Sequence, residues 1–188
     1  MTVYARKQSE SDIYHIYVRG NNFENIFKDK NDKNKYLDFV IKAKGKFNLE
    51  IYAYAIMDNH LHLLIKVDYE NLSKSMKYIQ QNYTYYFNKK YNRKGRIFES
   101  RFQSKPCKDD VYLTELVKYI HLNPKTAGLS EEYTYQFTSH RDYINLDSSF
   151  VDINFVLTFL SEDIYKAREI YFNLLNLPYK YSGKDIYE

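Results

Sequence analysis

The stretch MDNHLHLLI at residues 57–65 decides the fold, because it reads as a buried strand that carries two histidines. Side chains alternate between the two faces of a strand, so His60 and His62 share one face and the intervening leucines occupy the other. The face that carries the leucines is therefore predicted to pack into the hydrophobic core. Two neutral imidazoles on the opposite face can bind one divalent cation. The alternative, two exposed or hydrogen-bonded histidines without a metal, stays open at this point.

Length and composition limit the class of protein. A chain of 188 residues predicts one domain, or one domain with an appendage. The net charge of +4 and the pI near 8.8 permit a nucleic-acid partner without requiring one. A single cysteine, Cys107, excludes an internal disulfide and fits a reducing compartment. The sequence has no apolar run approaching the roughly 18 residues of a membrane span and no signal-like N-terminus, so we expect a cytoplasmic protein without a membrane partner.

The pattern of apolar residues predicts strands and helices on both sides of residues 57–65. The first half is predicted to contain a strand at 12–19, a helix capped by Asp32 and ending near Gly45, a strand at 49–57, and a two-residue hairpin turn at Asp58-Asn59. The second half is predicted to contain a helix at 71–91, strand character at 96–107, a helix begun by Asp109 or Asp110 and stopped by Pro124, an irregular region at 130–148, and one or two helices at 152–176.

This order of elements predicts an α+β fold. The economical arrangement is an antiparallel sheet with helices on one face, followed by a C-terminal helical extension. We place the domain that carries the chemistry at residues 1–148 and the extension at residues 149–188.

A second group of polar residues lies on the helix that precedes Pro124. Tyr119 and Asn123 are four residues apart, which separates them by about 40° around a helix and puts a phenol and a carboxamide on one face. The chain contains 22 tyrosines, so the presence of this one is not by itself evidence for catalysis. Taken alone, an ordinary amphipathic tyrosine remains the simpler interpretation.

Basic residues interleave with aromatic residues between positions 89 and 108. Cations for phosphates and rings for unpaired bases are what binding of single-stranded nucleic acid requires, although a charged run is often only a solvated surface. The candidate nucleic-acid-binding residues are Lys89, Lys90, Arg93, Arg96, Arg101 and Lys105.

Three motifs in this order resemble the single-tyrosine HUH transposases, and the closest group looks like the REP-associated tyrosine transposases, named for repetitive extragenic palindromes. The motifs are MDNHLHLL at 57–64, GRIFESRFQS at 95–104, and YIHLNP at 119–124 in front of AGL at 127–129. YHIYVRGNN at 14–22 and TSHRDY at 138–143 are similar to the flanking segments of that group. The resemblance therefore spans roughly residues 12 to 145.

Two residues depart from the pattern of the group. Asp58 stands where the group commonly has proline, and Phe23 stands where it commonly has arginine. Neither position carries a metal ligand or the nucleophile of the group. The change at Phe23 is expected to alter contacts with DNA.

The resemblance implies a ferredoxin-like HUH domain and a reaction. His60, His62 and the side-chain oxygen of Asn123 would hold Mg²⁺ or Mn²⁺, and the Tyr119 oxygen would attack a phosphodiester to give a 5′-phosphotyrosine. The implied substrate is single-stranded DNA with hairpin or palindromic structure, cut and rejoined by a monomer or a homodimer. His15 is a candidate neighbour of this site, and His121 is left outside it.

Two other functions compete with this interpretation. A noncatalytic or domesticated module that binds structured single-stranded nucleic acid would keep the basic residues without needing Tyr119. An unrelated metalloenzyme with a His-x-His motif, such as a cupin, is disfavoured by the low glycine content and the long predicted helices.

Overall fold

The computed structural model describes residues 6–130, 133–148 and 150–180. Residues 149 and 181–188 of the expected extension, and residues 131–132 of the expected irregular region, lie outside these ranges. The elements, in chain order, are β1 (Ile13–Arg19), the 3-10 helix η1 (Asn21–Phe23), α1 (Lys30–Phe47), β2 (Glu50–Ile56), β3 (His60–Lys66), α2 (Tyr69–Lys90), β4 (Gln103–Pro106), α3 (Asp110–Thr126), α4 (His140–Asn145), α5 (Ile153–Thr158) and α6 (Ile164–Leu174).

The four strands form an antiparallel sheet in the order β2-β3-β1-β4. Strand β3 is therefore paired on both sides. The predicted two-residue turn is present between β2 and β3, since the backbone N–H of Met57 donates to the carbonyl of His60 over 2.9 Å. The predicted α+β fold with an antiparallel sheet and C-terminal helices is confirmed.

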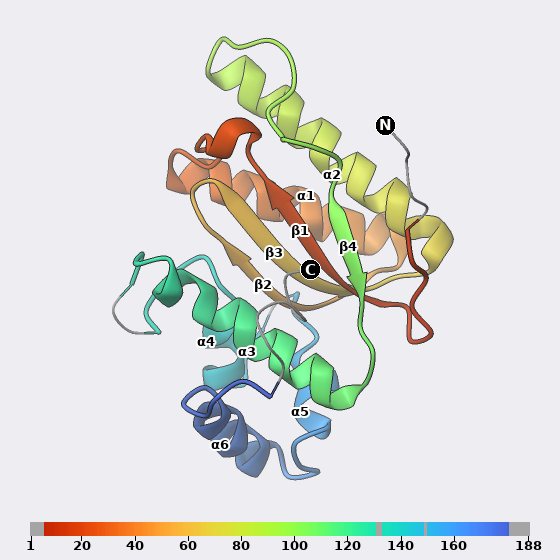
Figure 1. Cartoon of the computed structure of the whole chain (residues 1–188), viewed down its shortest axis with the longest axis vertical. Coiled ribbons are helices and arrows are strands. Elements are labelled where there is room, and N and C mark those ends of the chain that lie inside the picture. The colour runs from red at the N-terminus through yellow and green to blue at the C-terminus, as the bar shows by residue number, and fades with distance from the viewer. Residues whose placement is uncertain (1–5, 131–132, 149, 181–188) are drawn as a thin grey trace.

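The two faces of the sheet carry different side chains. Ile16 pairs with Leu63 and Val18 pairs with Leu61, and all four are buried. Helices α1 and α2 cover this apolar face, as predicted (Figure 1). Helix α3 instead lies against the opposite face, where it contacts β2 and β3 (Figure 1). The helices thus lie on both faces, and the histidine face of β3 is enclosed by α3.

Helices α1 and α2 differ from their predicted ends. The carboxylate of Asp29, not that of Asp32, caps α1 by accepting from the N–H of Asp32. Helix α1 continues through Gly45 and ends at Phe47, and the next residue, Asn48, caps it in the left-handed conformation at φ 51°. Helix α2 begins two residues earlier than predicted, at Tyr69.

The strand character predicted for residues 96–107 is confirmed only for β4. Tyr17 pairs with Gln103, and Gly20 forms an isolated bridge with Phe98. Residues 99–102 therefore lie opposite only two residues of β1, and the regular ladder is interrupted there. The region 130–148, predicted to be irregular, contains the short helix α4, whose His140 and Tyr143 are buried one turn apart.

Pro124 does not stop α3. The missing N–H of a proline removes one hydrogen bond, but the next turn is still closed because the N–H of Ala127 donates to the carbonyl of Asn123 over 2.9 Å. Gly128, at φ +70°, follows the helix in a conformation that glycine adopts without strain. Asn123 therefore remains helical, one turn from Tyr119.

The appended helices predicted within residues 152–176 are confirmed as α5 and α6. The Asp152 carboxylate anchors this region, since it accepts from the N–H of Ile51 over 2.9 Å and from the Lys44 ammonium over 2.7 Å. In the described part of the chain, the helices are too short or too polar to cross a membrane.

The buried carboxylate of Asp32 gives a test of the packing of α1 on α2. It is fully buried and accepts from the N–H of Lys28, from Lys90 and from the hydroxyls of Tyr86 and Tyr91. Asp32→Ala leaves these donors without an acceptor, so we expect the free energy of unfolding in urea to fall by about 3–5 kcal/mol. The control Asp38→Ala, at an exposed position, should cost no more than about 0.5 kcal/mol. Equal effects of the two changes would contradict this description.

Candidate active site

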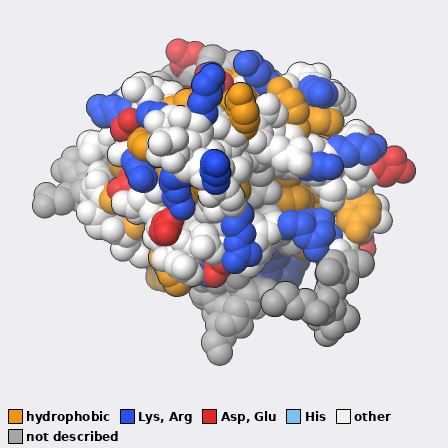
Figure 2. Space-filling model, turned by 90° about the horizontal axis from the view of Figure 1, so that it is seen from above, with side chains coloured by type: hydrophobic (Ala, Val, Ile, Leu, Met, Phe, Trp, Pro, Cys, Tyr) orange, Lys and Arg blue, Asp and Glu red, His pale blue; other side chains and the backbone are white. Residues whose placement is uncertain are grey.

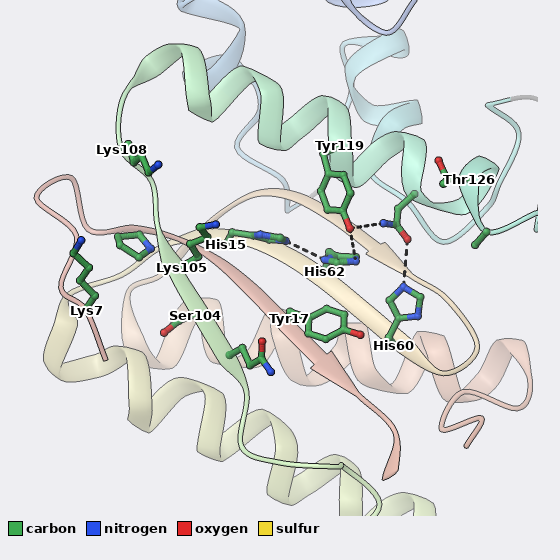
Figure 3. Close-up of a pocket in the computed structure, with 14 residues that line it drawn as sticks. Lys7, His15, Tyr17, His60, His62, Ser104, Lys105, Lys108, Tyr119 and Thr126 are labelled. Carbon is green, nitrogen blue, oxygen red and sulfur yellow. Dashed lines mark hydrogen bonds between the residues drawn. The ribbon is translucent and has the colours of Figure 1, made fainter. Parts of the chain in front are cut away.

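The pairing of β3 fixes which side chains share a face with the two histidines. Tyr17 and Ala55 lie opposite His62 on β1 and β2, and Arg19 lies opposite His60. Directly paired residues of antiparallel strands point to the same face. Because Ala55 is small, it leaves room above β2 for α3. The histidine face is thus formed by β1 and β3 and covered by α3 (Figure 3).

Helix α3 brings a phenol and a carboxamide to this face. The side-chain N–H of Asn123 donates to the Tyr119 hydroxyl over 2.8 Å, and both side chains are buried. The Tyr119 hydroxyl lies 3.4 Å from Nε2 of His62, and Oδ1 of Asn123 lies 3.3 Å from Nε2 of His60. The four residues proposed as nucleophile and metal ligands from the sequence are therefore in one cluster, of which Figure 3 labels His60, His62 and Tyr119.

His15 holds the ring of His62. Its Nε2 lies 3.0 Å from Nδ1 of His62, and the two rings are stacked with centroids 5.1 Å apart. Burial, reinforced by the charge of Lys105, lowers the pKa of His15 to about 4, and burial holds the pKa of His62 well below its ordinary value. Both rings are thus neutral at pH 7. When Nδ1–H of His62 donates to His15, the lone pair of Nε2 is presented to Tyr119.

His60 lies between two amide oxygens. Its Nδ1 is 2.6 Å from Oδ1 of Asn59, and its Nε2 is 3.3 Å from Oδ1 of Asn123. Burial is the main cause that lowers the pKa of His60, and a neutral imidazole donates from only one nitrogen. The shorter contact puts the proton on Nδ1. The lone pairs of Nε2 and of the Asn123 oxygen then face each other, and a cation between them would satisfy both.

The donor set fits a divalent cation. Nε2 of His60, Nε2 of His62 and Oδ1 of Asn123 provide two nitrogens and one oxygen. Mn²⁺ suits such a mixed set, whereas Mg²⁺ prefers oxygen and would keep waters or substrate oxygens. Within the ranges that the structure describes, no group of three or more His, Cys, Asp or Glu side chains is arranged to hold a metal. This set of two imidazoles and one amide would thus leave further coordination positions open.

A pocket of about 680 Å³ opens beside this cluster. His60 and His62 of β3 line it together with residues of β1, β4 and α3, and three lysines also line it: Lys7, Lys105 and Lys108. Lys105 was among the candidates from the sequence. Lys7 precedes the first strand and has no periodicity or motif that could have found it. Tyr17 was missed as well, although it shares the strand face of His15.

The other predicted nucleic-acid-binding residues do not line this pocket. Lys90 makes ion pairs of 2.7 Å with Asp29 and with Asp32, and Arg93 pairs with Glu24 over 3.1 Å. Arg96 and Arg101 line a second hollow, and Lys89 is exposed at the end of α2. Figure 2 shows Lys and Arg side chains spread over the end of the molecule that is at the top of Figure 1.

His121 faces away from the cluster, as predicted. Its two ring nitrogens lie 2.7 Å from the hydroxyl of Tyr171 on α6 and 2.7 Å from the hydroxyl of Ser139. The Ser139 oxygen also accepts from the backbone N–H of Tyr54 on β2 over 2.9 Å. These bonds fix the rotation of α3 about its axis, which directs Tyr119 toward β3.

The family described as "Transposase IS200 like" matches residues 8–123 of this chain. This range contains the histidine strand and ends at the last candidate ligand, Asn123. The chain belongs to the IS200-like Y1 transposase family. Among curated proteins, none matches the chain significantly.

One solved structure carries the description "Structure of the REP associates tyrosine transposase bound to a REP hairpin". The similarity to it has a TM-score of 0.67 at 17% sequence identity and covers 77% of this chain and 86% of that chain. The two proteins share a fold. The resemblance that the sequence motifs indicated is confirmed at the level of the family and the fold.

The buried histidine of α4 makes stability depend on pH. His140 donates to or accepts from Tyr171 over 2.6 Å, and burial lowers its pKa to about 4. The unfolded chain, with an ordinary pKa near 6.5, binds the proton more readily. Above pH 6.5, His140 is neutral in both states and does not reduce stability. As the pH falls from 6.5 to 4, protonation of His140 in the unfolded chain should lower the free energy of unfolding by about 3 kcal/mol.

His140→Gln keeps a hydrogen-bonding side chain but does not titrate in this range. Urea unfolding of this variant between pH 4 and pH 7 should show a shallower pH dependence than the unchanged chain, by up to one proton. Parallel pH profiles would show that His140 is not held neutral by the fold.

Proposed function

We propose that this chain cleaves and rejoins single-stranded DNA through a 5′-phosphotyrosine on Tyr119, in a reaction that requires Mg²⁺ or Mn²⁺. The observation that carries the proposal is the pair of contacts of the Tyr119 hydroxyl, one with His62 and one with Asn123. A nucleophile that touches two candidate metal ligands lies where a metal-bound phosphate would be placed.

His60, His62 and Asn123 are the proposed ligands. The bound cation would act as a Lewis acid on the scissile phosphate and neutralise charge that develops there. His15 and Asn59 orient the two imidazoles, because each lies within hydrogen-bonding distance of the ring nitrogen that does not face the site.

The proposed reaction is a transesterification that balances without a co-reactant. The Tyr119 oxygen forms a bond to the 5′-phosphate, and the bond from phosphorus to the 3′ oxygen breaks. The phenolic proton leaves Tyr119, and the departing 3′ oxygen gains one to become a hydroxyl. Asn123 donates to the phenolic oxygen and so favours its developing negative charge. The reverse reaction rejoins a strand, since the phosphotyrosine retains the energy of the phosphodiester.

The proposed substrate is DNA with hairpin or palindromic structure. The lysines of the pocket would bind phosphates next to the cleaved bond, and Arg96 and Arg101 at the second hollow would bind phosphates farther along. The solved tyrosine transposase of similar fold is described as bound to a hairpin, which supports this choice. We assign the catalytic unit to residues 1–148 and regard residues 149–188 as an extension.

The test is capture of the covalent intermediate. With hairpin-bearing single-stranded oligonucleotides and Mn²⁺, the unchanged chain should give a protein band shifted by attached DNA on a denaturing gel. Tyr119→Phe removes only the nucleophilic oxygen, so cleavage and adduct should fall by about a thousandfold or more. Binding of the same DNA should remain.

Tyr112→Phe is the matched control, because it alters another buried tyrosine of α3 and should keep the adduct. An adduct that persists in Tyr119→Phe would mean that another tyrosine is the nucleophile. Cleavage without any adduct would identify a metal-dependent nuclease that uses water. DNA binding without cleavage in the unchanged chain would favour the noncatalytic binding module.

A further inference from the structure

The turn after β1 presents an exposed aromatic ring on a strained backbone. Phe23 is 62% exposed. Asn22 and Phe23 both have positive φ, at 51° and 59°, a region that bulky side chains adopt at a cost. Asparagine or glycine would fit position 23 with less strain, and the exposed ring gains little from burial. The stability of the fold therefore does not account for phenylalanine here.

The neighbours of this turn leave it little freedom. A Cβ on Gly20 would lie 2.2 Å from the carbonyl oxygen of Glu24, so the chain passes too close for any other residue. The N–H of Asn21 donates to the carbonyl of Ile97 over 2.8 Å, and the N–H of Phe23 donates to that of Gly20 over 3.2 Å. The turn is thus fixed from both ends.

The ring of Phe23 is also held in place. The guanidinium of Arg19 lies 4.2 Å from its centroid. The same guanidinium is clamped by the Glu99 carboxylate, with Nε of Arg19 at 2.8 Å. The ring thus rests on a fixed cation, and most of its surface remains open to solvent. A preorganised ring loses little freedom when it stacks on a ligand.

This turn is connected directly to the candidate active site. Asn59 bonds Nδ1 of His60 through its amide oxygen and donates its amide N–H to the carbonyl of Phe23 over 3.5 Å. Arg19, beneath the ring, pairs with His60 across β1 and β3. In Figure 1 the turn lies beside the end of the β2–β3 hairpin. A DNA strand held at His60 would therefore pass the Phe23 ring.

We propose that Phe23 is a stacking platform for an unpaired nucleobase of the DNA strand that enters the site, an inference that rests on the proposed function. Aromatic rings bind bases through their π-faces and tolerate any sequence. The guanidinium of Arg19, neutralised by Glu99, holds the covered face of the ring so that the other face is presented to the base. The platform thus contributes affinity and fixes the position of the strand relative to the cleaved bond, without selecting a sequence.

Binding to a hairpin with unpaired thymidine arms, measured by fluorescence anisotropy without added divalent metal, tests the platform. Phe23→Asn should weaken binding by about 5- to 100-fold, since loss of one stacked base has effects of this order. The thermal midpoint of unfolding should stay equal or rise, because asparagine suits the left-handed backbone. Phe23→Trp should keep the affinity within about twofold.

The matched control is Tyr165→Asn on α6, another exposed aromatic beside a guanidinium, which should leave binding unchanged. Removing single bases from the unpaired arm then locates the stacked nucleotide. One abasic position should weaken binding to the unchanged chain but not add to the loss in Phe23→Asn.

The outcomes separate the two proposals. Binding that survives Phe23→Asn within twofold, or losses that add fully at every abasic position, would overturn the platform while leaving the proposed function intact. Failure of the unchanged chain to bind the hairpin would overturn both.

Discussion

The pairing of β3 with β1 on one side and β2 on the other is the constraint on which the site depends. It fixes the register at which His62 faces Tyr17 and Ala55. A slip of one residue would turn both histidines into the apolar layer beneath α1 and α2 and expose the leucines. Burial of Leu61 and Leu63 therefore secures the position of the imidazoles as firmly as it secures the core.

Helix α3 completes the site because it is tied to the same sheet. His121 and Ser139 connect it to β2, while Tyr119 and Asn123 reach the histidines of β3. The polar groups enclosed between helix and sheet satisfy one another, with neutral rings in place of charges. The exception is the contact between His60 and the Asn123 oxygen, and a cation would resolve it. This unsatisfied pair is where we propose that a metal binds.

Periodicity in the sequence was enough to predict that His60 and His62 share a face of one strand, and that Tyr119 and Asn123 share a face of one helix. It was not enough to bring the two pairs together, because the side of the sheet taken by α3 depends on long-range packing. Pro124 was misjudged since local rules ignore the hydrogen bonds that continue past it.

The basic residues illustrate the same limit. Lys90 and Arg93 could be counted as cations, but their partners come from the start of α1 and the turn after η1, far away in the chain. No pattern in the sequence marks Lys7, and only the folded structure places it at the pocket. Local patterns therefore predicted most of the elements, whereas only the tertiary contacts distinguish cations that make ion pairs within the fold from cations that line a pocket.

The most direct test of the central claim is anomalous diffraction from crystals of this chain grown with Mn²⁺. We expect one anomalous peak within coordination distance of Nε2 of His60, Nε2 of His62 and Oδ1 of Asn123, with the Tyr119 hydroxyl displaced from His62. A peak elsewhere, or no peak while Nε2 of His62 still accepts from Tyr119, would contradict the assignment of this cluster as the metal site.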